Sequence, residues 1–231
     1  MYKLGKYKKS DPMSVLVCEN YSVLLVMSRF GIALGFGDKT IEEVCRDSGV
    51  DVDTFLAVIN LLLDADEVEA TDTPFSIESL VQYLHKSHDY FLNFRLPAIR
   101  RSLLNAIDCR QKDVSFAILC FFDEYVAEVQ KHMLYEEQTV FPYVRALLAG
   151  KPVPKNYNIE VFSRQHDAVE AKLVELKNIL IKYYPAAGSN ELNAVLFDIF
   201  NCEKDLASHN SIEDRLFVPA IREIEKTRKA Q

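Results

Sequence analysis

Two histidines of the sequence are each followed, four residues later, by a glutamate: His132 by Glu136, and His209 by Glu213. Residues four apart on an α-helix lie on the same face, one turn from each other. An imidazole and a carboxylate at that spacing can bind one metal cluster, with the carboxylate bridging two ions. A single pair of this kind is usually a surface ion pair, but its duplication indicates a metal site.

Each pair is followed by an aromatic residue and a proline. The first is followed by Val140-Phe141-Pro142 and the second by Leu216-Phe217-Val218-Pro219. The remaining histidines of the chain are His85, His88 and His166. They fall in two other stretches of the sequence, which is where a site surrounded by four helices needs them.

Four long periodic stretches can position these residues. We place helices at about 76–107, 114–148, 157–184 and 190–227, separated by short segments rich in polar residues, glycine or proline. Each stretch contains at least one histidine. Four helices of this length with short connections predict an up-down four-helix bundle, the architecture in which di-metal carboxylate sites are built. The predicted fold class is all-α.

The first part of the chain has shorter helical patterns than the rest. Short helical patterns are interrupted by glycines, and Thr40 with Glu43 has the spacing of a helix-capping box. The polar segment 64–76 resembles a linker. We therefore expect a small helical domain over 1–70 and the bundle over 74–231.

The composition of the chain indicates its cellular compartment and excludes some classes of partner. The net charge of −7 argues against a nucleic-acid partner, whose phosphates would repel this surface. The five cysteines form no CxxC pair and are odd in number, which favours a reducing cytoplasm. No apolar run is long enough to span a bilayer, so we expect no membrane association.

The bundle motifs resemble the hemerythrin-like domain. The resemblance rests on 132-HMLYEEQTVFP-142, 165-QHD-167 and 208-SHNSIE-213, and residues 27–45 extend it toward a narrower family. That family is the iron-sulfur cluster repair di-iron proteins, also called regulators of cell morphogenesis and nitric oxide signalling. One departure concerns Leu34-Gly35, which stand where the family usually has two adjacent cysteines, so a thiol role there loses its residues.

The resemblance implies two non-haem iron ions, oxo- and carboxylate-bridged by Glu136 and Glu213. The implied metal ligands are His85, His132, Glu136, His166, His209 and Glu213. On the first helix, an ungapped match favours His85, whereas the position of Leu96-Pro97 favours His88 as an alternative or additional ligand. Glu128 and Asp205, one turn before each motif histidine, are expected to accept hydrogen bonds from the ligand imidazoles. Phenylalanines, including Phe91, Phe94, Phe141 and Phe162, are expected to line a dry pocket.

For function, the resemblance implies a stress-response protein that binds or reduces nitric oxide, O2 or peroxide and helps repair damaged iron-sulfur clients. Two alternatives stay open: a sensor whose N-terminal domain signals to a protein or DNA partner, and an O2- or iron-binding module without turnover. The sequence leaves open whether the chain is an enzyme, and a homodimer is compatible with the resemblance.

Overall fold

A computed structural model describes residues 6–63, 75–107, 112–154, 156–163, 167–184 and 190–229. The ordered secondary structure of these residues is helical, apart from an isolated bridge between Pro12 and Thr40. The predicted all-α class is therefore confirmed. The described residues divide into two compact units: residues up to 87 with 211–227, and residues 88–210 with the end of the last helix.

The first unit begins with four short helices: α1 (Met13–Glu19), α2 (Val23–Phe30), α3 (Ile41–Asp47) and α4 (Val52–Leu63). The Thr40 side chain accepts a hydrogen bond from the Glu43 backbone N–H, and the Glu43 carboxylate accepts one from the Thr40 N–H, so the predicted capping box is present. Asp51 accepts the Thr54 N–H at 2.8 Å at the start of α4. These caps let helices of about two turns end and restart within a small unit.

This unit also includes the beginning of α5 (Ile77–Asp89). The ring of Tyr83 lies 4.8 Å from that of Phe30, measured between centroids, and the Ser76 N–H donates to Thr54 Oγ1 at 2.9 Å. The compact unit therefore includes the chain up to Ser87, since residues of α5 contribute to the core of the N-terminal helices. The predicted division into a domain over 1–70 and a bundle over 74–231 stays a prediction. Residues 64–74, which include most of the predicted linker, lie outside the described residues.

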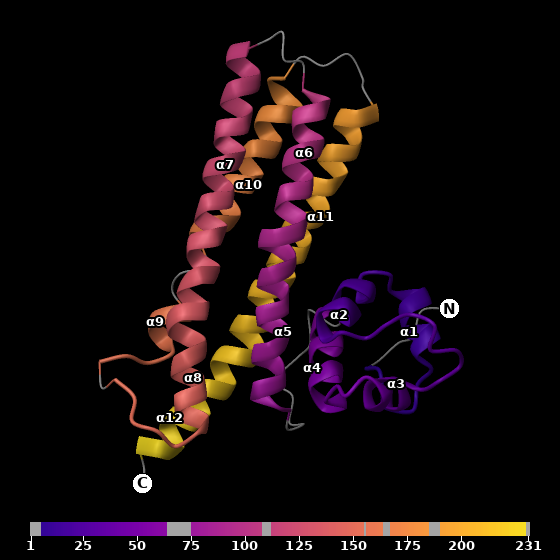
Figure 1. Cartoon of the computed structure of the whole chain (residues 1–231), viewed down its shortest axis with the longest axis vertical. Helices are drawn as coiled ribbons and strands as arrows, with labels where there is room; N and C mark the ends of the chain where they lie inside the picture. The colour runs from indigo at the N-terminus through magenta and orange to yellow at the C-terminus, as the bar shows by residue number, and fades with distance from the viewer. Residues whose placement is uncertain are drawn as a thin grey trace. The chain divides into compact units, whose positions relative to one another are not determined.

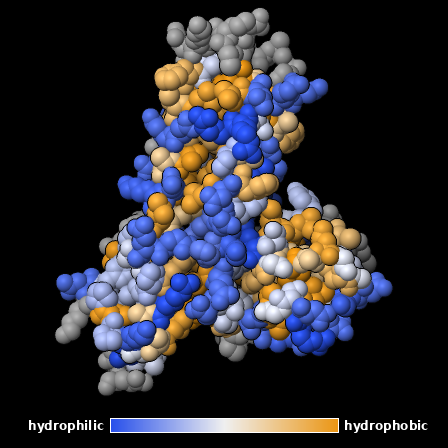
Figure 2. Space-filling view, in the orientation of Figure 1, coloured by the Kyte–Doolittle hydropathy of each residue, from blue (hydrophilic) through white to orange (hydrophobic). Residues whose placement is uncertain are grey.

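The second unit is the helical bundle (Figure 1), in which α6 (Leu96–Ala106), α7 (Lys112–Tyr135), α10 (Asp167–Lys182) and α11 (Asn190–Ile212) run side by side. Their apolar faces share one core. It includes Leu103, Phe122, Tyr125, Leu176 and Ile199. On the visible face of this bundle, hydrophilic and hydrophobic residues alternate (Figure 2), and some apolar side chains, such as Phe116 and Phe197, are exposed.

The predicted helices are interrupted by π-helical segments. They are η1 (Tyr90–Arg95) before α6, η2 (Glu136–Val140) before α8 (Phe141–Leu148), and η3 (Glu213–Phe217) before α12 (Val218–Lys229). A proline follows each segment, at Pro97, Pro142 and Pro219. Proline has no N–H to give to the carbonyl four residues earlier, so the widened turn comes where α-helical bonding would fail. Such π segments often occur at functional sites.

The described part of the third predicted helix comprises α9 (Glu160–Ser163) and α10, and residues 164–166, which include His166, lie outside the described residues.

Candidate metal centre

Four buried side chains bring their ligand atoms together. One nitrogen each of His88 and His209 and one oxygen each of Glu136 and Glu213 lie within 4.8 Å of one another. His88 belongs to α5, His209 to α11, and the two glutamates are the first residues of η2 and η3. Each glutamate therefore sits where its helix changes from α to π geometry, one turn after the motif histidine.

The carboxylate of Glu136 faces two imidazoles. Its Oε2 lies 3.2 Å from His88 Nε2, and its Oε1 lies 3.0 Å from His132 Nε2. His132 is about one-tenth exposed, and Glu136 is fully buried. Two oxygens that each face a nitrogen of a different histidine are arranged as a carboxylate would be if it joined two metal positions.

Glu136 also provides the test of whether a cation fits. Among the described residues, neither of its buried oxygens has a hydrogen-bond partner, despite the short distances to the imidazole nitrogens. An ionised carboxylate buried without such partners costs several kcal/mol or more, and Glu213 adds a second buried carboxylate. Imidazole nitrogen with carboxylate oxygen is a donor set suited to iron, manganese or zinc. The residues therefore fit a metal ion.

Aromatic rings fix the orientation of the histidines. His88 stacks on Phe141 with an interplanar angle of 8°, and His132 stacks on Phe162 at 14°. The ring of Phe91 meets His209 edge-on, with centroids 5.9 Å apart. These three phenylalanines are buried and form the expected apolar wall, which limits the access of water to the ligand atoms. Phe94, expected in the same wall, is instead 61% exposed.

Glu137 was not anticipated. The His88 Nδ1–H donates to Glu137 Oε1 at 2.8 Å, so consecutive glutamates face the two nitrogens of one imidazole. The sequence offered a signal for this contact, since an acid follows the motif glutamate in both copies: Glu137 after Glu136 and Asp214 after Glu213.

On the first helix the structure brings His88, and not the preferred His85, to the cluster. His85 is exposed, whereas His88 is 3% exposed and belongs to the cluster. The physical reason is helix phase: the two residues are about 60° apart around the axis, and the inward face of α5 passes through Leu84 and His88. The alternative based on Leu96-Pro97 gave the position that the structure brings to the cluster.

The roles of the other predicted site residues stay predictions. His166 lies outside the described residues, so its role as a ligand stays a prediction. Glu128 and Asp205 are half-buried on α7 and α11, and their predicted hydrogen bonds to the ligand imidazoles likewise stay predictions.

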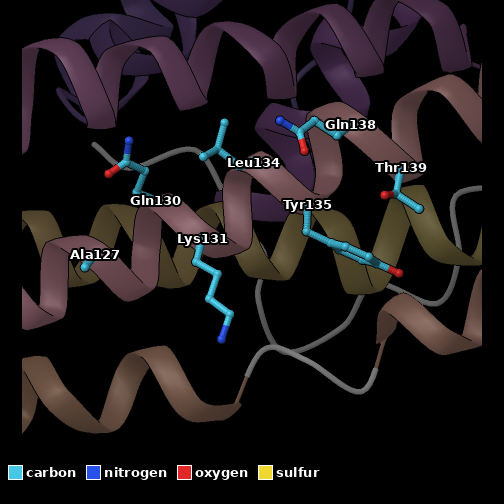
Figure 3. Close-up of a pocket in the computed structure, with 7 residues that line it drawn as sticks. All are labelled: Ala127, Gln130, Lys131, Leu134, Tyr135, Gln138 and Thr139. Carbon is cyan, nitrogen blue, oxygen red and sulfur yellow. The ribbon is translucent and has the colours of Figure 1, made fainter.

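A separate open groove of about 550 Å³ lies along α7 and η2 (Figure 3). Its lining residues are Ala127, Gln130, Lys131, Leu134, Tyr135, Gln138 and Thr139. None of the four cluster residues lines it, so this groove is distinct from the candidate metal centre.

Thiol chemistry at Cys45 is not supported. Burial raises the pKa of Cys45 to about 12, so this thiol stays protonated near neutral pH and is a poor nucleophile. Together with Leu34-Gly35 in place of a cysteine pair, this leaves Cys45 as a small core side chain of α3.

In the part of the chain that the structure describes, none of the helices combines the length and apolarity needed to cross a bilayer. A comparison of the chain with curated proteins gives no match. The family model of the hemerythrin HHE cation-binding domain matches residues 79–221, a range that contains every predicted ligand. This match covers more than half of the chain and agrees with the buried histidine-glutamate cluster: the chain belongs to the hemerythrin HHE cation-binding domain family.

Proposed function

We propose that this protein is a non-haem di-iron protein of the nitrosative and oxidative stress response, which binds or reduces nitric oxide, O2 or peroxide and helps repair damaged iron-sulfur centres. The observation that supports it best is the duplicated motif, whose glutamates lie together in a buried cluster with His88 and His209. Each motif copy supplies one histidine and one carboxylate, and the other helices add His88 and His166.

The side chains have separate tasks in this proposal. Glu136, Glu213 and the histidines of the different helices would hold the metal, with the two glutamates shared between its two positions. When bound, iron would supply a place for a small ligand and the capacity to exchange electrons. Phe91, Phe141 and Phe162 hold the imidazole rings and exclude water, so that a small apolar molecule such as nitric oxide or O2 enters a dry site.

Anaerobic reconstitution with Fe2+ tests the proposal. We expect close to two irons per chain, a coupled di-iron Mössbauer spectrum, and a changed absorption spectrum on addition of nitric oxide. A stoichiometry of one, or uptake of zinc alone after iron-replete expression, would contradict the di-iron site. Turnover of nitric oxide with an electron donor would identify an enzyme, whereas binding without turnover would favour a carrier or a sensor.

A sensor is the second candidate, and a specific contact favours it. Tyr83 of α5 packs on Phe30 of α2, and His88 lies five residues further along the same helix. A shift of α5 on ligand binding would therefore be felt directly by the N-terminal helices, which could signal to a partner. Recovery of iron-sulfur enzyme activity after nitric oxide exposure, measured with and without the Phe30→Ala change, separates the two: a sensor needs this contact, and a repair enzyme with an independent site does not.

A further inference from the structure

The outer surfaces of α10 and α11 carry large apolar side chains that are exposed to solvent. On α10 these are Val174 and Ile181, and on α11 they are Phe197 and Phe200. Val174 and Ile181 are seven residues apart and Phe197 and Phe200 three apart, so each pair lies on one side of its helix. A soluble protein normally exposes such side chains singly, and four of them on two neighbouring helices indicate an interaction surface.

An ion pair shows that these two helix surfaces adjoin each other. Lys177, which lies between Val174 and Ile181 on α10, pairs with the carboxylate of Glu203 on α11. Its ammonium group also lies 4.5 Å from the centroid of the Phe200 ring. The residues of both helices therefore border one seam, which we call the α10–α11 face. It consists of Val174, Lys177, Ile181, Phe197, Phe200 and Glu203.

The charges of the α10–α11 face cancel. Its two charged residues are Lys177 and Glu203, which pair with each other, and the Lys177 side chain is mostly buried. The chain as a whole carries a net charge of −7, so two copies repel each other over most of their surfaces. A face without net charge is where a second copy meets the least repulsion, and it offers nothing to attract a strongly charged partner.

The exposed apolar area suits a dimer of ordinary size. Phe197 and Phe200 are 70% and 44% exposed, and Val174 and Ile181 are 45% and 57% exposed. At these fractions the four side chains together offer about 300 Å² of apolar surface. That is more than a third of the roughly 800 Å² that each partner buries in a standard interface, in which a polar rim supplies much of the rest.

We propose that two copies of this chain associate through the α10–α11 face, related by a twofold axis. In such a dimer the same patch of both copies meets itself, so each copy needs a surface that is apolar and carries no net charge. Side chains three and seven residues apart form the ridges with which helices pack on one another. No residue of the face belongs to the buried histidine-glutamate cluster, so the proposal does not depend on the proposed function.

Sedimentation equilibrium of the full chain tests the dimer. An interface of this size predicts a Kd in the micromolar range or tighter. Phe197→Glu and Ile181→Glu, one on each helix, should each raise that Kd at least about tenfold, because each buries a carboxylate in the interface without a partner. Added salt should not weaken the dimer, since the charges of the face pair within each copy.

Phe116→Glu is the matched control. Phe116 is also a phenylalanine that is 70% exposed, but it lies on α7, outside the α10–α11 face. This variant should leave the Kd unchanged. All three replaced side chains are exposed, so melting temperature and iron content should stay near those of the wild-type chain.

Two results would overturn the proposal. One is a wild-type chain that stays monomeric at about 100 µM, well above the expected Kd. The other is an equal rise of the Kd in Phe116→Glu and Phe197→Glu, which would show that the added charge and not the face weakens association. Should Phe197→Glu fail to fold, Ile181→Glu tests the same face from the other helix. The measurement on metal-free protein remains valid if the di-iron proposal fails.

Discussion

The helices α7 and α11 contain the same motif, and both copies reach the cluster from the same kind of local structure. In each, a histidine is followed four residues later by a glutamate that opens a π segment, and ten residues later by a proline. The acid that comes next is partly buried in the first copy, where Glu137 contacts His88, and exposed in the second, at Asp214. The comparison indicates that helix geometry sets the positions of the two motif glutamates, while the burial of the acid after each glutamate differs between the copies.

The largest effect is expected from removing either of the two carboxylates that we propose as bridges. Glu136→Ala and Glu213→Ala should each abolish the coupled di-iron spectrum. They should also abolish the rise in melting temperature that metal gives the wild-type chain, since bound metal contributes folding free energy of about 2.7 kcal/mol at a free concentration one hundred times Kd. In the metal-free protein the same changes remove a buried charge, so stability there should not fall correspondingly.

Calorimetry with and without Fe2+ measures the rise in melting temperature that metal gives each variant and the wild-type chain. If both variants lose this rise to the same extent, the two glutamates have equivalent bridging roles. If only one variant loses the coupled spectrum, the other glutamate is not a bridge.

The first helix gives the next largest effect. His88→Ala should reduce the iron content and alter the Mössbauer spectrum, because it removes a buried nitrogen of the cluster. His85→Ala is the matched control three residues away on the exposed side of α5, and its iron content should stay near that of the wild-type chain. Metal analysis of both variants after identical reconstitution compares their iron contents. A lower iron content in His85→Ala than in His88→Ala would identify His85 as the ligand.

This case shows how far the sequence could predict the site. The duplicated motif identified Glu136, His209 and Glu213 because a four-residue spacing is a local property of one helix. The choice between His85 and His88 depended on the phase of α5 relative to its neighbours. The proline offered a local guide, since Pro97 comes nine residues after His88 and twelve after His85, against ten in the motif helices.

Other features depended on tertiary packing. Glu137 could not be assigned, because its contact joins residues 49 apart in the sequence. The packing of Tyr83 on Phe30 could not be predicted either, since a linker-like composition at 64–76 does not show which helix α5 contacts. The class of fold and the long helices were predictable because apolar periodicity continues over many turns.

Removal of the N-terminal helices should affect stability more than metal binding. A chain consisting of residues 74–231 keeps both motif copies and all predicted ligands, so we expect it to bind two irons. It loses the ring of Phe30 that covers Tyr83, together with the hydrogen bond of Ser76 to Thr54. Its melting temperature should therefore fall below that of the full chain, and apolar surface exposed on α5 favours association.

Circular dichroism measures the melting temperature, light scattering measures association, and metal analysis measures the iron content. An insoluble or iron-free product would show that the bundle needs the N-terminal helices. The single change Phe30→Ala is a milder version in the full chain, and it should lower stability without changing the iron content.

The smallest effect on stability is expected from the ion pairs between the motif helices and the segment that contains Arg95 and Arg100. Arg100 makes a two-point contact with Asp123 of α7, at 2.7 and 2.8 Å, and Arg95 contacts Asp198 of α11 at 3.0 Å. The Arg100 guanidinium lowers the pKa of Asp123. Because both partners of this pair are partly exposed, Asp123→Asn should cost only about 0.2–1 kcal/mol.

The pH dependence has a definite sign. A carboxylate whose pKa is lowered by folding stabilises the native state above its unfolded pKa, near 4. This contribution is lost as the pH falls through the lower folded value. The stability difference between wild type and Asp123→Asn should therefore be present at pH 7 and shrink below about pH 4, as measured by urea unfolding. A difference that grows on acidification would contradict the assignment.

The three π segments also determine which way the residues after them face. Each segment takes its chain through a wider turn, so the residues after it face a direction that an unbroken α-helix with the same number of residues would not give. If the residues between Glu136 and Pro142 formed an unbroken α-helix, the rod would be longer by only about 1.5 Å. Phe141, on which His88 stacks, would nevertheless face a direction about 100° away around the axis. In this protein the width of one helical turn thus sets the orientation of the wall behind the cluster.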